Sequence, residues 1–265
     1  MCTRNIRVGM RFLVVPSALT ALIVFAACTG SDTKTVTVER TVTETTASTV
    51  PNEAPAALTV FFLRDGKVAP ATRSTVVGSD LPAAAVQALL EGPTPNDVGY
   101  ATAIPESIEA GSTELAGDTV IVGLIPEPKD PAARAQIVYT LTALPNVKRV
   151  SFGGGNPVGR KAFEKQTPAI LVESPLPGEQ VEPGFDVTGT ANTFEATFNY
   201  ELLGASGKVL SKNFVTATSG SGTRGTFAFT VPYEAEPQAG RLRVFELSAA
   251  DGSRINETEI PLRLE

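Results

Sequence analysis

The feature that most limits how this chain can fold is a change of pattern after residue 167. From residue 170 to residue 264, apolar and polar residues alternate in short runs that turn residues separate at regular spacing. Such alternation is typical of strands with one face on a core and one face in water. The predicted strands are 170–173, 185–190, 196–202, 209–215, 226–231, 242–248 and 259–264. Residues 168–265 are therefore predicted to form an all-β, two-sheet sandwich.

Residues 57–160 mix strands with helices. Runs 58–63 and 68–77 predict two strands, and residues 64–67, with the sequence Arg-Asp-Gly-Lys, have turn chemistry. A helix is predicted over 81–91, with Ser79 or Asp80 as its N-cap and Val86, Leu89 and Leu90 on one face.

A second helix is predicted to begin at Asp130-Pro131, since an N-cap residue followed by proline is a strong start signal. Its apolar stripe consists of Ile137, Val138, Leu141 and Leu144. A short strand after 103–105, a hairpin around Gly117-Asp118 and a closing strand over 147–152 complete the pattern. The prediction is an α+β domain with two helices against one mixed sheet, joined to the sandwich by a hinge at 161–167.

Several motifs in the first domain resemble the GerMN domain of bacterial sporulation and spore-germination proteins. They are Val60-Phe61-Phe62, Leu89-Leu90-Glu91-Gly92-Pro93-Thr94, Ala103-Ile104-Pro105, Gln136-Ile137-Val138 and Val150-Ser151-Phe152. The family is not known for catalysis. Some members build oligomers, so the resemblance implies a homo-oligomer as one kind of partner.

The second domain resembles the immunoglobulin-like domain of bacterial spore-germination proteins. The residues that carry this resemblance are 174–178, 187–191, 194–196, Phe227, Phe229, 245–248 and 251–253. A GerMN-like domain followed by such a sandwich is itself a recurrent pairing.

The N-terminus has the features of an export signal. Arg4, Arg7 and Arg11 precede an apolar run over 12–27, and no acidic residue occurs before Asp32. The run ends in Phe25-Ala26-Ala27-Cys28, which resembles the lipobox of bacterial lipoproteins. The resemblance implies cleavage between Ala27 and Cys28 and a diacylglyceryl group on the Cys28 thiol. Residues 1–27 are thus predicted to be a lipoprotein signal peptide.

Two other interpretations of this leader are weaker. A transmembrane helix needs about 20 apolar residues, and the 16 residues of 12–27 include Pro16, Ser17 and Thr20. A plain secretory signal would leave Cys28 without a role. Translation from Met10 instead of Met1 remains open, because Met10-Arg11-Phe12 would itself begin a compact signal.

Residues 28–56 are predicted to be a tether. Nine of the residues in 29–50 are threonine, and such low hydrophobicity cannot offset the entropy of ordering. A strand over the alternating Thr35–Val38 and Thr41–Thr43 segments is the alternative. Two acyl chains on Cys28 give stable membrane attachment, so we expect the domains to be held at the outer face of the cytoplasmic membrane.

Composition excludes several classes of function. The net charge is −6, and removing residues 1–27 takes it to −9, which disfavours nucleic acid as a partner. The chain has no histidine, and its only cysteines are Cys2 and Cys28. Ser-His-Asp catalysis, cysteine nucleophiles and Cys/His zinc sites are therefore not expected in the mature protein, nor is a cofactor.

The remaining candidates for chemistry are weak. The glycine-rich segment 153–159 lacks a phosphate-loop ending and a predicted helix behind it. Two carboxylate pairs, Glu106 with Glu109 and Glu127 with Asp130, are typical of solvated surface. Phe194-Glu195 is either a recognition feature or a core phenylalanine beside a solvated glutamate.

The sequence favours a non-enzymatic, membrane-anchored lipoprotein that binds a protein or a cell-wall polymer. Two alternatives stay open. One is a carboxylate-dependent enzyme acting on wall glycan, which needs two carboxyl groups about 5 to 9.5 Å apart in a groove. The other is a structural protein that assembles with itself.

Overall fold

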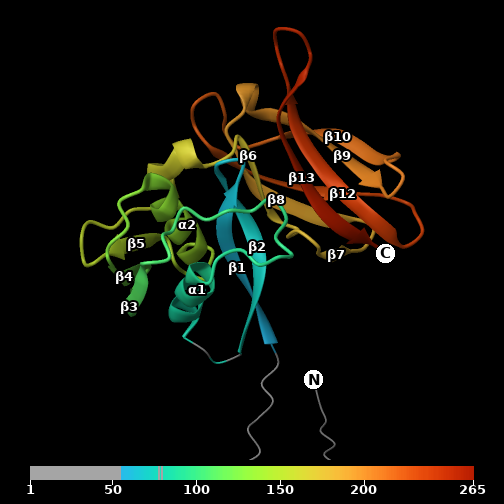
Figure 1. Ribbon diagram of the computed structural model, residues 1–265. Helices are drawn as coiled ribbons and strands as arrows, with labels where there is room; N and C mark the ends of the chain where they lie inside the picture. Colours follow the sequence, from blue (N-terminus) through green and yellow to red (C-terminus); the bar gives the residue numbers. More distant parts are fainter. Residues whose placement is uncertain (1–54, 77, 79) are drawn as a thin grey trace, which may run out of the picture. The chain divides into compact units, whose positions relative to one another are not determined.

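The computed structural model describes residues 55–76, 78 and 80–265 (Figure 1). The predicted signal peptide, the Ala27–Cys28 cleavage and lipidation site, Met10 and residues 28–54 of the tether lie outside the described residues. Residues 55 and 56, which the sequence placed in the tether, already belong to the first strand.

The fold begins with a two-stranded antiparallel sheet, formed by β1 (Pro55–Arg64) and β2 (Lys67–Val76). The pairing is continuous from Pro55↔Val76 to Arg64↔Lys67. Asp65 and Gly66 turn the chain with φ values of 51° and 74°, which is the backbone of a two-residue hairpin loop. The predicted strands and turn are confirmed.

Both predicted helices form, and both are capped as expected. The Asp80 carboxylate accepts a hydrogen bond from Ala83 N at the start of α1 (Leu81–Leu90). Asp130 does the same for Ala132 N, at 2.8 Å, at the start of α2 (Pro131–Leu141). These caps satisfy amide groups that a helix leaves without partners in its first turn.

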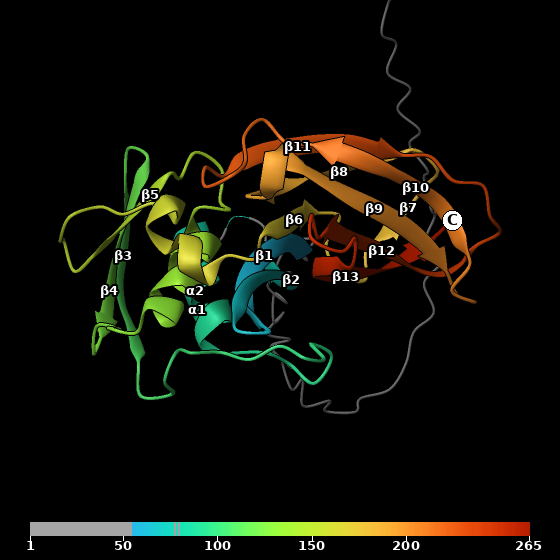
Figure 2. The same cartoon turned by 90° about the horizontal axis from the view of Figure 1, so that it is seen from above.

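α2 is buried on all sides, not along one stripe as predicted. It contacts α1, β1, β2 and β5 (Figure 2), and its Gln136 and Thr140 are fully buried. Thr140 Oγ1 accepts from Phe61 N at 2.9 Å, and Gln136 Nε2 donates to Phe61 O at 3.3 Å. These polar side chains take the place of a neighbouring strand along β1.

Side chains of α2 thus satisfy the backbone of β1 at Phe61, so β1 needs no strand partner there. This explains why the first domain has two sheets where the sequence predicted one. The second sheet contains β3 (Glu109–Ala116), β4 (Thr119–Ile125) and β5 (Arg149–Phe152), in that order. β3 pairs with β4 antiparallel, and β4 pairs with β5 parallel, so this sheet is mixed. The α+β class and the hairpin around Gly117-Asp118 are confirmed.

The segment predicted as a hinge is ordered and partly buried. Residues Arg160–Gln166 form a 3-10 helix, η1, whose Phe163 side chain is 7% exposed. Thr167 is also buried, and its hydroxyl lies 2.7 Å from the hydroxyl of Tyr139 on α2. The sequence pattern missed this because a single phenylalanine in a polar segment produces no periodicity.

The second domain is the predicted two-sheet sandwich (Figure 2). One sheet has the order β10-β9-β12-β13-β7, and the other has the order β11-β8-β6. All seven predicted strands are present, and the two-residue β7 is additional. The bounds are β6 Ile170–Ser174, β7 Gln180–Val181, β8 Phe185–Ala191, β9 Thr197–Gly204, β10 Val209–Thr216, β11 Gly225–Val231, β12 Gln238–Leu247 and β13 Arg254–Leu264.

Two apolar clusters form the cores. The first lies in the α+β part and also includes Leu171 of β6. The second fills the sandwich, where Phe198, Tyr200, Phe227 and Phe229 pack with ring centroids 4.8 to 6.3 Å apart. Among the described helices, none has the length and apolarity needed to cross a membrane.

Candidate functional site

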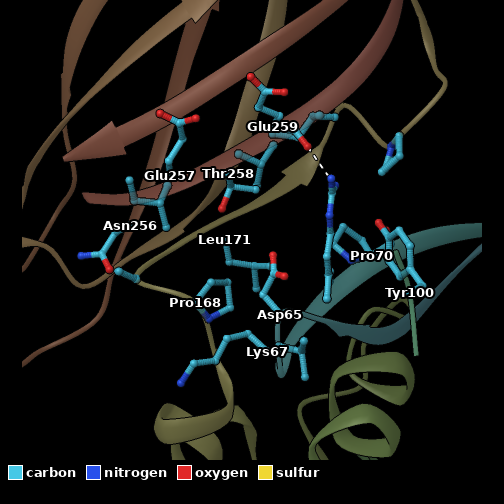
Figure 3. Close-up of a pocket in the computed structure, with 18 residues that line it drawn as sticks. Asp65, Lys67, Pro70, Tyr100, Pro168, Leu171, Asn256, Glu257, Thr258 and Glu259 are labelled. Atoms are coloured by element: carbon cyan, nitrogen blue, oxygen red, sulfur yellow. Dashed lines mark hydrogen bonds between the residues drawn. The ribbon is translucent and has the colours of Figure 1, made fainter. Parts of the chain in front are cut away.

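A cavity of about 460 Å³ lies where the β1–β2 turn meets strands β6 and β13 (Figure 3). We call it the hairpin groove and define it by residues 64, 65, 67–70, Tyr100, 168–172, Pro177 and 256–260. Its volume falls in the range of about 300 to 1,000 Å³ that is usual for ligand sites. The groove is therefore large enough to hold a ligand or a short segment of a partner.

The hairpin supplies two cationic side chains to the groove. Arg64 Nη1 donates a hydrogen bond to the Glu259 carbonyl oxygen at 3.0 Å (Figure 3). Lys67 Nζ donates to the Lys165 carbonyl oxygen at 2.6 Å. The tight turn at Asp65-Gly66 places both side chains at the end of the hairpin.

The aromatic wall of the groove is fixed by one hydrogen bond. Tyr100 Oη donates to Pro70 O at 2.7 Å. Burial raises the pKa of the Tyr100 hydroxyl above its ordinary value, and the neighbouring Arg64 only partly offsets this. Tyr100 is thus a neutral hydrogen-bonding group at physiological pH.

The acidic side chains of β13 are engaged elsewhere. Glu259 Oε1 accepts from Arg243 Nη2 at 2.6 Å, and Glu257 Oε1 lies 3.4 Å from Arg243 Nε. Figure 3 shows both carboxylates directed away from Asp65 and Lys67 of the hairpin. Arg243 also lies 3.4 Å from Glu201, so these side chains form a charge network on the sheet. The carboxylates of Glu257 and Glu259 are thus engaged with Arg243 on the sheet and do not form a pair of acids in the groove.

The structure does not bring the predicted carboxylate pairs together as a site. Glu127 accepts from Arg134 at 2.8 Å, and Asp130 caps α2. Glu106 is exposed, as is Glu109 at the start of β3. The solvated-surface interpretation fits these positions.

The amides of the glycine-rich segment 153–159 are turned into the fold. Gly153 N donates to Val122 O, Gly155 N donates to Phe152 O, and Val158 pairs with Val150. The 3-10 helix η1 begins directly after Gly159, which the sequence did not predict. Because three of its amides already have backbone partners, the segment offers no phosphate cradle of the kind known from nucleotide-binding loops.

Phe194 is not a core residue. Its side chain is 64% exposed, although its backbone amide donates to the buried Glu246 carboxylate at 2.8 Å. The next two residues, Glu195 and Ala196, both have positive φ. The alternative that made Phe194 part of the core is wrong, because this turn directs its ring into solvent.

A second cavity, of about 570 Å³, lies beside η1 and contains Arg160 and Arg224. Arg160 Nη1 contacts Glu173 at 2.6 Å, and Arg224 Nη2 contacts Glu164 at 2.9 Å. Both guanidinium groups are used in these structural ion pairs. In the described part of the chain, no group of three His, Cys, Asp or Glu residues is placed to hold a metal ion.

Comparison with known protein families matches both halves of the described chain. Residues 59–156 match the family described as sporulation and spore germination. Residues 169–253 match the immunoglobulin-like domain of bacterial spore germination. The chain contains a GerMN domain followed by an immunoglobulin-like domain of the bacterial spore-germination type. The hairpin groove spans both matched domains, but β13 lies beyond the matched part of the immunoglobulin-like domain.

Two solved structures are similar to parts of the chain. The tandem GerMN domains of the sporulation protein GerM from Bacillus subtilis are 24% identical, with a TM-score of 0.34; the match covers 40% of this chain and 45% of that one. A putative lipoprotein from Clostridium perfringens is 16% identical, with a TM-score of 0.28, over 43% of this chain and 93% of that one. The chain thus spans less than half of the GerM structure. No curated protein matches it.

No pattern in the sequence predicted the hairpin groove. The sequence identified residues 64–67 as a turn, but a turn sequence does not indicate which strand the turn will meet. Pro261 within the last predicted strand was an available signal, since proline inside a strand points to an edge.

Proposed function

We propose that this GerMN protein is a non-enzymatic lipoprotein, anchored through Cys28 at the outer face of the cytoplasmic membrane. It acts there as a binding or scaffold module in a process related to sporulation or germination, and its partner is a protein or a cell-wall polymer. The observation that carries the proposal is the order of the sequence: a leader ending in Ala26-Ala27-Cys28, then two germination domains in tandem.

The electrostatics of the described residues favour binding over acid-base catalysis. A general acid needs a carboxyl group with a raised pKa. The described carboxyl groups with a resolved shift, Asp97, Asp118, Glu164 and Asp251, all have a lowered pKa. In Asp118 and Glu164 the main cause is a hydrogen bond from an arginine, and in Asp251 it is one from Ser253. For Asp97, burial raises the pKa, but hydrogen bonds from Arg73 and Thr94 outweigh it.

The anchor is tested by labelling and fractionation. Cells expressing the full chain, or its Cys28→Ser variant, are grown with a radioactive or alkyne-bearing palmitate and separated into membrane and soluble fractions. We expect label and membrane association for the wild-type chain. We expect no label for the Cys28→Ser variant, because serine has no thiol to carry the lipid. An unlabelled wild-type chain would show that the anchor is wrong.

The non-enzymatic part is tested separately. Purified full chain in detergent is incubated with isolated cell-wall glycan, and the supernatant is assayed for reducing sugars and soluble fragments. We expect no release above a no-protein control. Release that is lost on replacing Glu106, Glu109 or Glu127 by glutamine would establish the carboxylate enzyme instead.

A further inference from the structure

We propose that the hairpin groove binds an extended, acidic peptide segment of a partner protein, which pairs with the open edge of β13 and places a carboxylate on Arg64. This inference rests on the proposed binding function and names the chemistry of its partner. It does not depend on the lipid anchor, so each can fail without the other.

The first step concerns which backbone groups of β13 face the groove. Pro261 has no N–H and pairs with Arg241 of β12, while its carbonyl accepts from Gly178 N at 2.8 Å on the opposite side. Residues two apart in a strand point their backbone groups the same way. The N–H and C=O groups of Glu259 therefore also point away from β12 and into the groove.

The second step is that this stretch of edge is open. β7 pairs with β13 only at Arg263 and Leu264, which leaves residues 256–260 without a strand neighbour on that side. Arg64 Nη1 donates a hydrogen bond to the Glu259 carbonyl oxygen, and no described residue accepts a hydrogen bond from the Glu259 N–H. An open strand edge binds an extended peptide by adding it as a further strand.

The third step is the charge of the occupant. A guanidinium group has five N–H donors, and the Glu259 carbonyl occupies one nitrogen of Arg64. Lys67 is the second cation of the groove, and its Nζ donates to Lys165 O. Of the three acids that line the groove, Glu257 and Glu259 contact Arg243, which leaves Asp65 as the one acid there outside that charge network. An acidic side chain on the bound peptide would complete the hydrogen bonding of Arg64 in a partly enclosed site, where such bonds are strongest.

The test measures peptide binding to the full chain in detergent by fluorescence anisotropy. The probe is the labelled hexapeptide Thr-Val-Asp-Val-Thr-Val with blocked ends. One control peptide carries lysine in place of aspartate. A second has alternate backbone amides N-methylated, which removes strand pairing and keeps the charge. We expect both controls to bind at least about tenfold more weakly than the probe.

A matched pair of variants locates the peptide on β13. Glu259→Pro removes the N–H that faces the groove and leaves the pairing with β12 intact, as Pro261 does two residues later. Glu259→Ala removes the same ion pair with Arg243 but keeps the N–H. We expect Glu259→Pro to weaken binding about fivefold or more relative to Glu259→Ala, and Arg64→Gln to abolish the preference for aspartate over lysine.

Hydrogen exchange gives a readout that does not depend on the variants folding. Peptide binding should slow amide exchange in residues 256–260 of the wild-type chain and leave β10, the far edge of the same sheet, unchanged. The proposal is overturned if the N-methylated or lysine peptide binds as well as the probe, if no peptide binds, or if a soluble wall-glycan fragment protects residues 256–260 where the peptide does not.

Discussion

At the scale of single residues, Glu246 holds the exposed Phe194 in position. The carboxylate is only 6% exposed, and it accepts hydrogen bonds from the Phe194 amide and from Asn256 Nδ2. Glu195, Ala196 and Asn256 around it all adopt positive φ, a conformation that costs non-glycine residues free energy. The buried carboxylate therefore stabilises a backbone shape that the sequence alone would not favour.

Replacing Glu246 should be far more damaging than replacing Phe194. Glu246→Ala leaves two partly buried donors, Phe194 N and Asn256 Nδ2, without their acceptor. We expect it to lower the free energy of unfolding by about 1–3 kcal/mol. Phe194→Ala should change it by less than about 1 kcal/mol, because the ring is in solvent. Urea denaturation of both variants checks this, and equal losses would show that the Phe194 ring packs against the fold.

The contacts of the Asp97 carboxylate predict how the stability of the fold depends on pH. This carboxylate binds Arg73 Nη2 at 2.6 Å and accepts from the amide and hydroxyl of Thr94. Because its pKa in the folded chain is below the ordinary value of 3.8, its contribution is present above that value and is lost as the pH falls through the lowered pKa. The wild-type chain should thus exceed Asp97→Asn in stability at pH 6, and the difference should shrink towards pH 2. A difference that is constant with pH would contradict this assignment.

At the scale of elements, Arg224 attaches η1 to the sandwich. Its guanidinium group contacts both Glu164 oxygens of η1 and donates to the carbonyls of Thr190 and Pro168. Arg160 adds a second connection, from η1 to Glu173 on β6. The segment between the two domains is therefore fixed by planar, multidentate contacts of a kind that lysine cannot reproduce.

We expect Arg224→Lys to lower the free energy of unfolding by about 1–2 kcal/mol and Arg224→Ala to lower it by about 2–3 kcal/mol. The matched control is Arg149→Ala, which breaks the surface pair with Asp118 and should cost no more than about 0.5–1 kcal/mol. Chemical denaturation measures all three. If Arg224→Lys were as stable as the wild-type chain, charge alone would account for the contact.

At the scale of the whole molecule, local patterns in the sequence predicted most elements, and contacts between distant elements account for what was missed. The caps at Asp80 and Asp130 and the seven sandwich strands follow from local signals that are strong in themselves. The split of the first sheet depends on Gln136 and Thr140 meeting Phe61, 75 or more residues away along the chain. No local pattern carries that information.

The hairpin groove could not be predicted from the sequence for the same reason. Its cations come from a hairpin and its open edge comes from the last strand, and Arg64 and Glu259 are 195 residues apart. The sequence pattern predicted the turn and the strand separately, but it did not predict that they are in contact. Cys28, in contrast, is a local signal that needs no fold to be recognised.

The most direct measurement of the central claim is the intact mass of the protein purified from the membranes of its native cells, with sequencing of its N-terminal peptide. We predict a chain that begins at Cys28 and carries a diacylglyceryl thioether on that residue. A chain that retains residues 1–27 with an unmodified Cys28 thiol would contradict the account.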